Sequence, residues 1–168
     1  MRAWVFGDNV DTDVLAPGRY MKLGIGAMAP HCLEALDPSF AGAVKRGDVL
    51  VAGRNFGTGS SREQAVEALR HLGITVLVAE SFAGLFYRNA LNLGLPAVAC
   101  PQARRIRPGD RLQVDVFGGS IENLTTGERL ACEPIPEHLA QMVRDGGLLA
   151  HMEKRLLKGA LDGSRTQG

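Results

Sequence analysis

The chain has 168 residues, of which 45% are apolar and 22% are charged, and 19 basic against 18 acidic side chains leave a net charge of +1. This composition excludes a disordered chain and fits one domain with one core, while the balanced charge gives no electrostatic basis for a nucleic-acid or membrane-surface partner. Without an apolar run of about 18 residues or a signal-peptide pattern, the sequence predicts a cytoplasmic protein.

Short apolar runs alternate with helical patterns through the first two thirds of the chain. The expected strands cover residues 2–6, 49–52, 75–79 and 96–99. Two helices are expected between the last three strands, one with Ala65, Leu69 and Leu72 on its apolar face and one over residues 82–93. Continuous apolar strands separated by helices indicate parallel pairing with right-handed crossovers. The sequence therefore predicts an α/β fold with a parallel core.

Between the first two expected strands the pattern is irregular. Residues 7–19 show no apolar periodicity and are expected to form a polar loop, and residues 31–35 can begin a short helix. After Pro108 the pattern changes, because residues 111–116 alternate and glycine-containing turns follow them. This change predicts that antiparallel strands accompany the parallel core.

The C-terminal part is predicted to be helical and then to lose its structure. A helix is expected over residues 134–145, and residues 148–157 continue the helical pattern. We expect a single domain over residues 1–158 and a flexible tail over residues 159–168.

The three cysteines, Cys32, Cys100 and Cys132, lie far apart and form no C-x-x-C pair. Neither a disulfide framework nor a metal site within this chain is indicated.

The densest functional signal is the glycine-rich turn Gly57–Glu63 between a buried strand and a helix. Such a turn presents free backbone N–H groups and the positive end of the helix dipole, which favour an anion, and Arg62 adds a guanidinium that can grip a carboxylate. The same residues also read as a capping box, in which Ser60 caps the helix and Glu63 returns the bond. Capping alone and a carboxylate or phosphate site both remain open at this point.

Other catalytic patterns fit this turn less well. No lysine follows the glycine as a phosphate-binding P-loop requires, and Ser60 lacks the G-x-S-x-G context of a hydrolase nucleophile.

The loop over residues 8–13 carries three acids at alternating spacing, but it lacks the downstream glycine and glutamate of a calcium-binding loop. It is either a solvated turn or a segment in which one acid fixes a cation such as Arg62. A second loop, over residues 19–26, places cationic and aromatic groups beside glycines and suits a substrate lid.

Together these motifs resemble one family. The resemblance rests on the stretches GDNVDTD (7–13), PGRY (17–20), GRNFGTGSSREQA (53–65) and SFAGLFYRNA (81–90), and it covers nearly the whole chain except the tail. The sequence is similar to the small subunits of the two-subunit hydro-lyases of the aconitase superfamily, which include 3-isopropylmalate dehydratase, homoaconitase and 2,3-dimethylmalate dehydratase.

The resemblance implies a swivelling β/β/α domain, like the aconitase C-terminal domain, that closes over a large partner subunit. That large subunit is expected to carry a 4Fe-4S cluster, with no cofactor or metal in this chain. Reactions of this family remove and re-add water across a hydroxy di- or tricarboxylic acid. The resemblance implies that Ser60 is the catalytic base, that Ser61 and Arg62 bind a substrate carboxylate, and that Asp13 belongs to the active-site network.

The resemblance also assigns substrate selection to Tyr20, Met21, Lys22 and Leu23. An isopropyl group calls for an apolar contact there, whereas the additional carboxylate of homoaconitate calls for a cation. Lys22 can serve a third carboxylate or turn to solvent while Met21 and Leu23 line an apolar pocket. We expect 3-isopropylmalate dehydration, as in leucine biosynthesis. Homoaconitase, 2,3-dimethylmalate dehydratase and a stand-alone carboxylate-binding domain are the alternatives.

Overall fold

The computed structural model describes residues 1–165 and contains a four-stranded sheet and a three-stranded sheet. The strands are β1 (Ala3–Val5), β2 (Val49–Ala52), β3 (Val76–Ala79), β4 (Ala97–Ala99), β5 (Leu112–Asp115), β6 (Ser120–Asn123) and β7 (Arg129–Ala131). The α-helices are α1 (Thr12–Leu15), α2 (Ile25–Met28), α3 (Phe40–Ala43), α4 (Glu63–Leu72), α5 (Gly84–Asn92), α6 (Glu137–Arg144) and α7 (Leu148–Arg165). The 3₁₀ helices are η1 (Gly18–Leu23), η2 (Ala29–His31) and η3 (Ala103–Arg105).

The larger sheet confirms the expected parallel core. Its strands follow one another in the order β1-β2-β3-β4, and every neighbouring pair is parallel. All four residues of β2 and of β3 are buried, as expected for strands covered on both faces.

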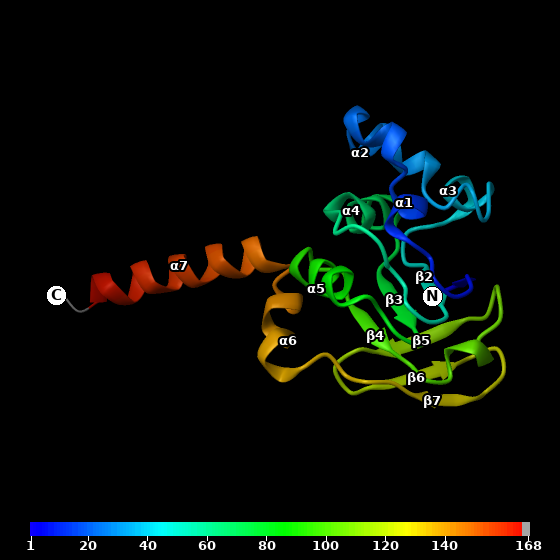
Figure 1. Ribbon diagram of the computed structural model, residues 1–168. Helices are drawn as coiled ribbons and strands as arrows, with labels where there is room; N and C mark the ends of the chain where they lie inside the picture. The colour runs from blue at the N-terminus through cyan, green and yellow to red at the C-terminus, as the bar shows by residue number, and fades with distance from the viewer. Residues whose placement is uncertain (166–168) are drawn as a thin grey trace.

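Alternation along these strands sends side chains to two separate hydrophobic cores. Leu50 and Leu77 join the helices in one core, whereas Val51 and Val78 join the antiparallel sheet in the other. Helices α4 and α5 therefore cover one face of the parallel sheet, and β5, β6 and β7 cover the other (Figure 1). This is the β/β/α architecture that the resemblance implied.

The segment between β1 and β2 is more helical than its sequence indicates. The stretch expected to be a polar loop contains α1, whose N-terminus is capped by the Asp11 carboxylate accepting from the Val14 N–H at 2.9 Å. The short helix expected from His31 instead ends there, as η2, and Leu33 adopts a positive φ of 60°. Short segments of this kind have no periodicity to read, because one helical turn is shorter than the pattern.

The C-terminal helix differs most from expectation. Helix α7 runs to Arg165 and projects away from the rest of the molecule (Figure 1), so residues 159–165 are its last turns rather than a loose tail. Residues 166–168 lie outside the described residues. Asp145 anchors the first turns of α7 by accepting hydrogen bonds from His151 Nδ1 at 2.7 Å and Lys154 Nζ at 2.9 Å. Bonds to His151, Lys154 and Gln141 hold the pKa of Asp145 well below its usual range.

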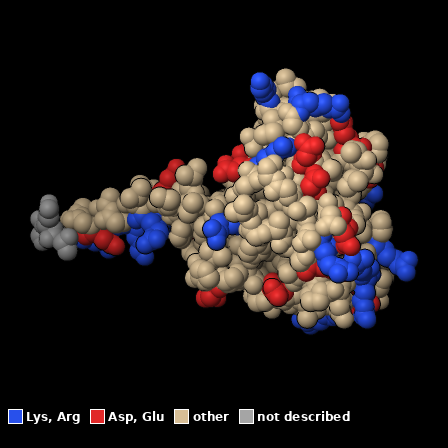
Figure 2. Space-filling model, viewed as in Figure 1, with Lys and Arg blue, Asp and Glu red and all other residues tan. Residues whose placement is uncertain are grey.

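Among the described residues, no helix has both the length and the apolar character needed to cross a bilayer. On the face shown in Figure 2, basic side chains lie beside acidic ones and form no continuous basic surface.

Candidate active site

The turn with Ser60 leaves the carboxyl end of β2 and enters α4. Gly57 and Gly59 adopt positive φ values of 84° and 101° there, and a Cβ on Gly57 would overlap the ring of Phe86. Only glycine meets both demands at position 57, because its backbone tolerates this conformation and its lack of a side chain leaves room for the ring.

The capping box expected at this turn does not form. Helix α4 begins at Glu63 with Arg62 as its N-cap residue, and no side chain bonds to the cap. Ser60 lies too far before the helix to cap it, so its exposed hydroxyl has no hydrogen-bond partner among the described residues. The expectation that the Ser60 side chain caps α4 is therefore wrong.

The backbone around Ser60 is fixed while its donors stay available. The buried hydroxyl of Thr12 donates to the Ser60 carbonyl at 2.8 Å, which holds the turn against α1. The amide N–H groups of residues 59–62 have no acceptor within the part of the chain that is described. Free amides at the start of a helix are suited to an anion.

Arg62 forms an ion pair with Asp13, one of the three acids that the sequence offered as partners for a cation. Arg62 Nη1 donates to Asp13 Oδ1 at 3.0 Å and to the Ala16 carbonyl at 3.0 Å. The Arg62 and Gly18 bonds hold the pKa of Asp13 below its usual value, so the carboxylate stays charged near neutral pH. Arg62 Nε and Nη2 have no partner within residues 1–165, and they remain available for a carboxylate.

Ser61 is held from a different element. Asn89 on α5 donates through Nδ2 to the Ser61 Oγ at 3.1 Å. Ser60, Ser61, Arg62 and Asp13 thus lie on connected segments of one site. Sequence reasoning assigned no role to Thr12 or Asn89, although both lie inside the motifs that carry the family resemblance.

The four residues expected to select the substrate divide into two pairs. Tyr20 and Met21 are half-buried and pack against the hydrophobic core, whereas Lys22 and Leu23 are exposed. Leu23 is 60% exposed, and Lys22 makes no ion pair among the described residues. Neither bonds to the Ser60–Arg62 segment, so the chain by itself does not bring all the expected site residues together.

Contacts with His31 and Arg19 stabilise the position of the Tyr20 ring, and the sequence did not predict the stacking on His31. The Tyr20 ring stacks on the His31 ring with centroids 3.6 Å apart. The guanidinium of Arg19, which precedes Tyr20 on η1, lies 4.9 Å from the centroid of the Tyr20 ring. Glu34 accepts from Arg19 at 3.4 Å and contacts His31 Nδ1 at 2.8 Å. A bond to His31, reinforced by Arg19, keeps the pKa of Glu34 below its ordinary value.

A depression of about 620 Å³ lies between this cluster and the ion pair, lined in part by Asp13, Gly18, Arg19 and Glu34. Gly18 N–H donates to Asp13 Oδ1 at 3.2 Å, so Asp13 connects the start of η1 to Arg62. The depression is therefore open to solvent, and it lies beside η1, whose first residue, Gly18, is bonded to Asp13.

The cysteines do not suit a metal cluster. Cys32, Cys100 and Cys132 are buried, and burial raises the pKa of Cys32 to about 12 and that of Cys132 to about 11. A thiolate is the form that binds metal, and these environments oppose it. Within residues 1–165, no group of three His, Cys, Asp or Glu side chains is placed to hold a metal ion.

Comparisons with known proteins agree with the architecture. Residues 35–103 match the aconitase C-terminal domain. The chain is 45% identical to the homoaconitase small subunit of Methanothermobacter thermautotrophicus, over 94% of this chain and 92% of that protein. It is 46% identical to the 3-isopropylmalate dehydratase small subunit of Caldicellulosiruptor saccharolyticus, over 96% and 94% of the two chains.

The fold is also similar to a solved structure. The crystal structure of 3-isopropylmalate dehydratase from Methanocaldococcus jannaschii superposes with a TM-score of 0.91 at 40% identity, covering 96% of each chain. Similarity therefore extends over both sheets and most of the helices.

Proposed function

The chain belongs to the aconitase C-terminal-domain family, among the small subunits of 3-isopropylmalate dehydratase and homoaconitase, and on that basis we propose how its residues act in such a hydro-lyase. In this proposal it pairs with a large subunit and moves a hydroxyl group between adjacent carbons of a 2-hydroxy acid by loss and return of water. The observation that carries the proposal is the exposed, unbonded hydroxyl of Ser60 beside free amides and Arg62.

Ser60 is proposed to remove the proton from the carbon next to a substrate carboxylate. An alkoxide requires strong stabilisation, and the free amides at the start of α4, the helix dipole and Arg62 are the groups near it that provide positive charge. Thr12 fixes the Ser60 backbone so that the hydroxyl keeps its direction during proton transfer. In the hydration step Ser60 gives a proton back to one of the two carbons, and water supplies the hydroxyl to the other.

Arg62 and Ser61 are proposed to bind the substrate carboxylate. Asp13 holds Arg62 through Nη1, which leaves the remaining guanidinium N–H groups for the substrate. The cysteines of this chain do not fit an iron-sulfur cluster. A cluster held by the large subunit would supply the Lewis acid for the leaving hydroxyl.

We propose 3-isopropylmalate as the substrate, with homoaconitate as the second candidate. Met21 and Leu23 supply apolar surface on η1, and relatives named for the dehydratase match the chain over almost its full length. The exposed ammonium of Lys22, which has no ion pair among the described residues, favours the second candidate, as does the homoaconitase relative.

Reconstitution tests the function directly. The chain is purified alone and together with the cluster-bearing large subunit of the same organism, and each sample is assayed with 3-isopropylmalate, homoaconitate and 2,3-dimethylmalate. We expect turnover only in the complex and fastest with 3-isopropylmalate. Turnover by this chain alone, or a fully loaded complex that acts on none of these acids, contradicts the proposal.

A further inference from the structure

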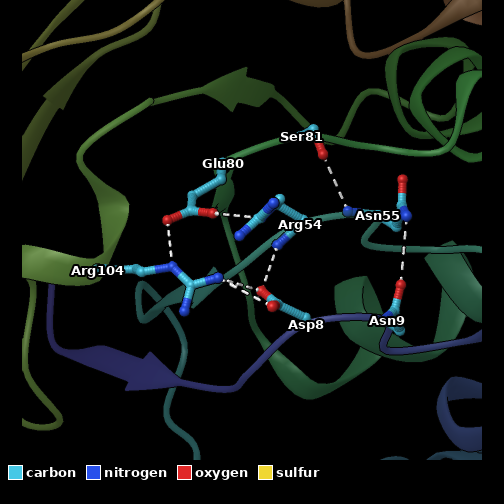
Figure 3. A network of polar contacts seen from close by, with 7 residues as sticks. All are labelled: Asp8, Asn9, Arg54, Asn55, Glu80, Ser81 and Arg104. Carbon is cyan, nitrogen blue, oxygen red and sulfur yellow. Dashed lines mark hydrogen bonds and ion pairs between the residues drawn. The ribbon is translucent and has the colours of Figure 1, made fainter.

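A charged residue follows each strand of the parallel sheet at its carboxyl end. These residues are Asp8 after β1, Arg54 after β2, Glu80 after β3 and Arg104 near the start of η3 after β4. Their side chains meet in one network, with Arg104 between the two carboxylates (Figure 3). The network lies on the same edge of the sheet from which the Ser60 turn departs, and the proposed chemistry does not use it.

Arg104 binds both carboxylates at once. Its Nη2 donates to Asp8 Oδ1 at 2.8 Å and Oδ2 at 2.9 Å, and its Nε donates to Glu80 Oε1 at 2.5 Å. Glu80 also pairs with Arg54 Nε at 3.6 Å. The Arg54 N–H bond and the Arg104 side chain hold the pKa of Asp8 below its usual value, so the network stays charged near neutral pH.

The segment from Gly53 to Arg62 lies between the two loops that Arg104 connects. On the Asp8 side, four backbone bonds join the loop after β1 to this segment: Gly53 N to Gly7 O at 3.1 Å, Asn9 N to Arg54 O at 2.8 Å, Gly57 N to Val10 O at 2.8 Å and Thr12 N to Thr58 O at 2.9 Å. Arg54 N also donates to Asp8 Oδ1 at 2.8 Å. The Asp8 carboxylate therefore contacts both Arg104 and the backbone of the Gly53–Arg62 segment.

The loop after β3 holds the other side of the same segment. Asn55 N–H donates to Ser81 Oγ at 2.9 Å, Phe56 N–H donates to the Ser81 carbonyl at 3.1 Å, and Ala83 N–H donates to the Phe56 carbonyl at 2.9 Å. Ser81 immediately follows Glu80, which Arg104 also grips (Figure 3).

The backbone conformation of the Gly53–Arg62 segment and of the loop after β1 depends on these contacts. Asn9 and Asn55 adopt positive φ values of 56° and 55°, in the left-handed region that non-glycine residues occupy at a cost. Their side chains bond between the loop after β1 and the Gly53–Arg62 segment, from Asn55 Nδ2 to Asn9 Oδ1 at 3.2 Å. Backbone conformations of this kind persist where the surrounding contacts hold them.

We propose that Arg104 is a positioning residue for Ser60: it clamps the loops after β1 and β3 on the two sides of the Gly53–Arg62 segment and so fixes the base without touching substrate. The inference rests on the proposed role of Ser60. Arg104 follows the last strand of the sheet, and therefore the geometry of the serine depends on a residue far along the chain.

The test compares Arg104→Gln with Arg105→Gln in the complex with the large subunit. Arg105 lies next to Arg104 on η3 and pairs with Glu128 at 3.1 Å, away from both loops, so it controls for loss of a surface arginine. We expect Arg104→Gln to lower kcat about tenfold or more with KM changed less than about threefold, since misplacing a catalytic group by about 1 Å costs up to about a hundredfold. Arg105→Gln keeps the wild-type kcat.

Amide hydrogen exchange in the full chain gives a readout that is independent of activity. Exchange at Arg54, Asn55 and Phe56 is expected to accelerate in Arg104→Gln and not in Arg105→Gln. Arg104→Lys should recover part of kcat, because one ammonium still reaches one carboxylate. If Arg104→Gln does not fold, Glu80→Gln removes the same clamp from its other end and takes its place.

Two results overturn the proposal: a folded Arg104→Gln complex with wild-type kcat, or unchanged exchange over these amides. A wild-type complex without hydro-lyase activity refutes the proposed function instead, while the exchange experiment still decides whether Arg104 orders the loop.

Discussion

The two ends of the parallel sheet both carry polar clusters, but the clusters differ in what they leave unpaired. At the amino end, Asp48 is buried just before β2 and accepts from Trp4 Nε1 at 2.9 Å and from the Lys45 N–H at 2.8 Å. At the carboxyl end, Ser60 and the amides of residues 59–62 have free donors. A cluster whose donors are paired within the protein stabilises the fold, whereas unpaired donors are available to a ligand.

This contrast predicts that substitutions at the carboxyl end affect turnover, whereas substitutions at the amino end affect stability. The Asp48 carboxylate accepts its hydrogen bonds from Trp4 and Lys45 of the same chain, so its position requires no ligand. The Ser60 turn is held rigidly through its carbonyls while its donors point to no protein acceptor.

The largest effect is expected for Ser60→Ala. Removal of the proposed base should lower kcat about a thousandfold, within the range that positioned general bases contribute. The melting temperature should stay unchanged, since this hydroxyl bonds to nothing within residues 1–165. Steady-state kinetics of the complex and thermal unfolding measure the two effects, and Ser164→Ala at an exposed position on α7 is the control. Near-normal turnover in Ser60→Ala removes the catalytic role.

A smaller loss of activity is expected for Arg62→Lys. Lysine keeps the charge but cannot bind Asp13 and a substrate carboxylate through one planar fork, so kcat/KM should fall about ten- to a hundredfold, the scale of a charge-assisted bond. Arg70→Lys, an exposed position on the same helix, should leave kcat/KM unchanged. Equal kinetics for both variants would show that Arg62 only anchors the Asp13 loop.

Asp48→Ala is expected to produce the opposite phenotype. It strands the Trp4 indole N–H and the Lys45 amide, and the loss of such bonds should cost about 2 kcal/mol of unfolding free energy. The kcat of the folded complex should stay at the wild-type value. Denaturant unfolding measures the first quantity, with Asp37→Ala in a surface turn as control. A specific loss of kcat in stable Asp48→Ala breaks the comparison between the two ends.

The smallest effect is expected for Lys22→Ala, and it sharpens the choice of substrate. If Lys22 pairs with a third carboxylate, kcat/KM for homoaconitate falls about tenfold while 3-isopropylmalate is unaffected. We expect no such selective loss, because Met21 and Leu23 on η1 are the residues proposed to supply apolar contacts to the substrate. Parallel kinetics with both acids decide the matter, and a loss confined to homoaconitate reverses the assignment.

Features that depend on local pattern were predictable from the amino-acid sequence alone. The apolar runs of β2 and β3 and the periodicity of α4 predicted the parallel core, because burial on both faces or on one stripe is visible in the spacing of side chains. The motif around Ser60 and the hypothesis that one acid of residues 8–13 fixes a cation such as Arg62 also came from residue chemistry. The contact between Arg62 and Asp13 agrees with that hypothesis, whereas the catalytic role of Ser60 stays a prediction.

Contacts between distant segments could not be predicted in this way and became visible in the folded protein. Ser60 matches a capping box by spacing, yet α4 begins only at Glu63. The Ser60 carbonyl instead accepts a hydrogen bond from the Thr12 hydroxyl on α1. Arg104 meets Asp8 across 96 positions of sequence, and Tyr20 meets His31 by stacking. Contacts of this kind leave no period in the sequence, since they are fixed by the order of the strands and the folding of loops onto one edge of the sheet.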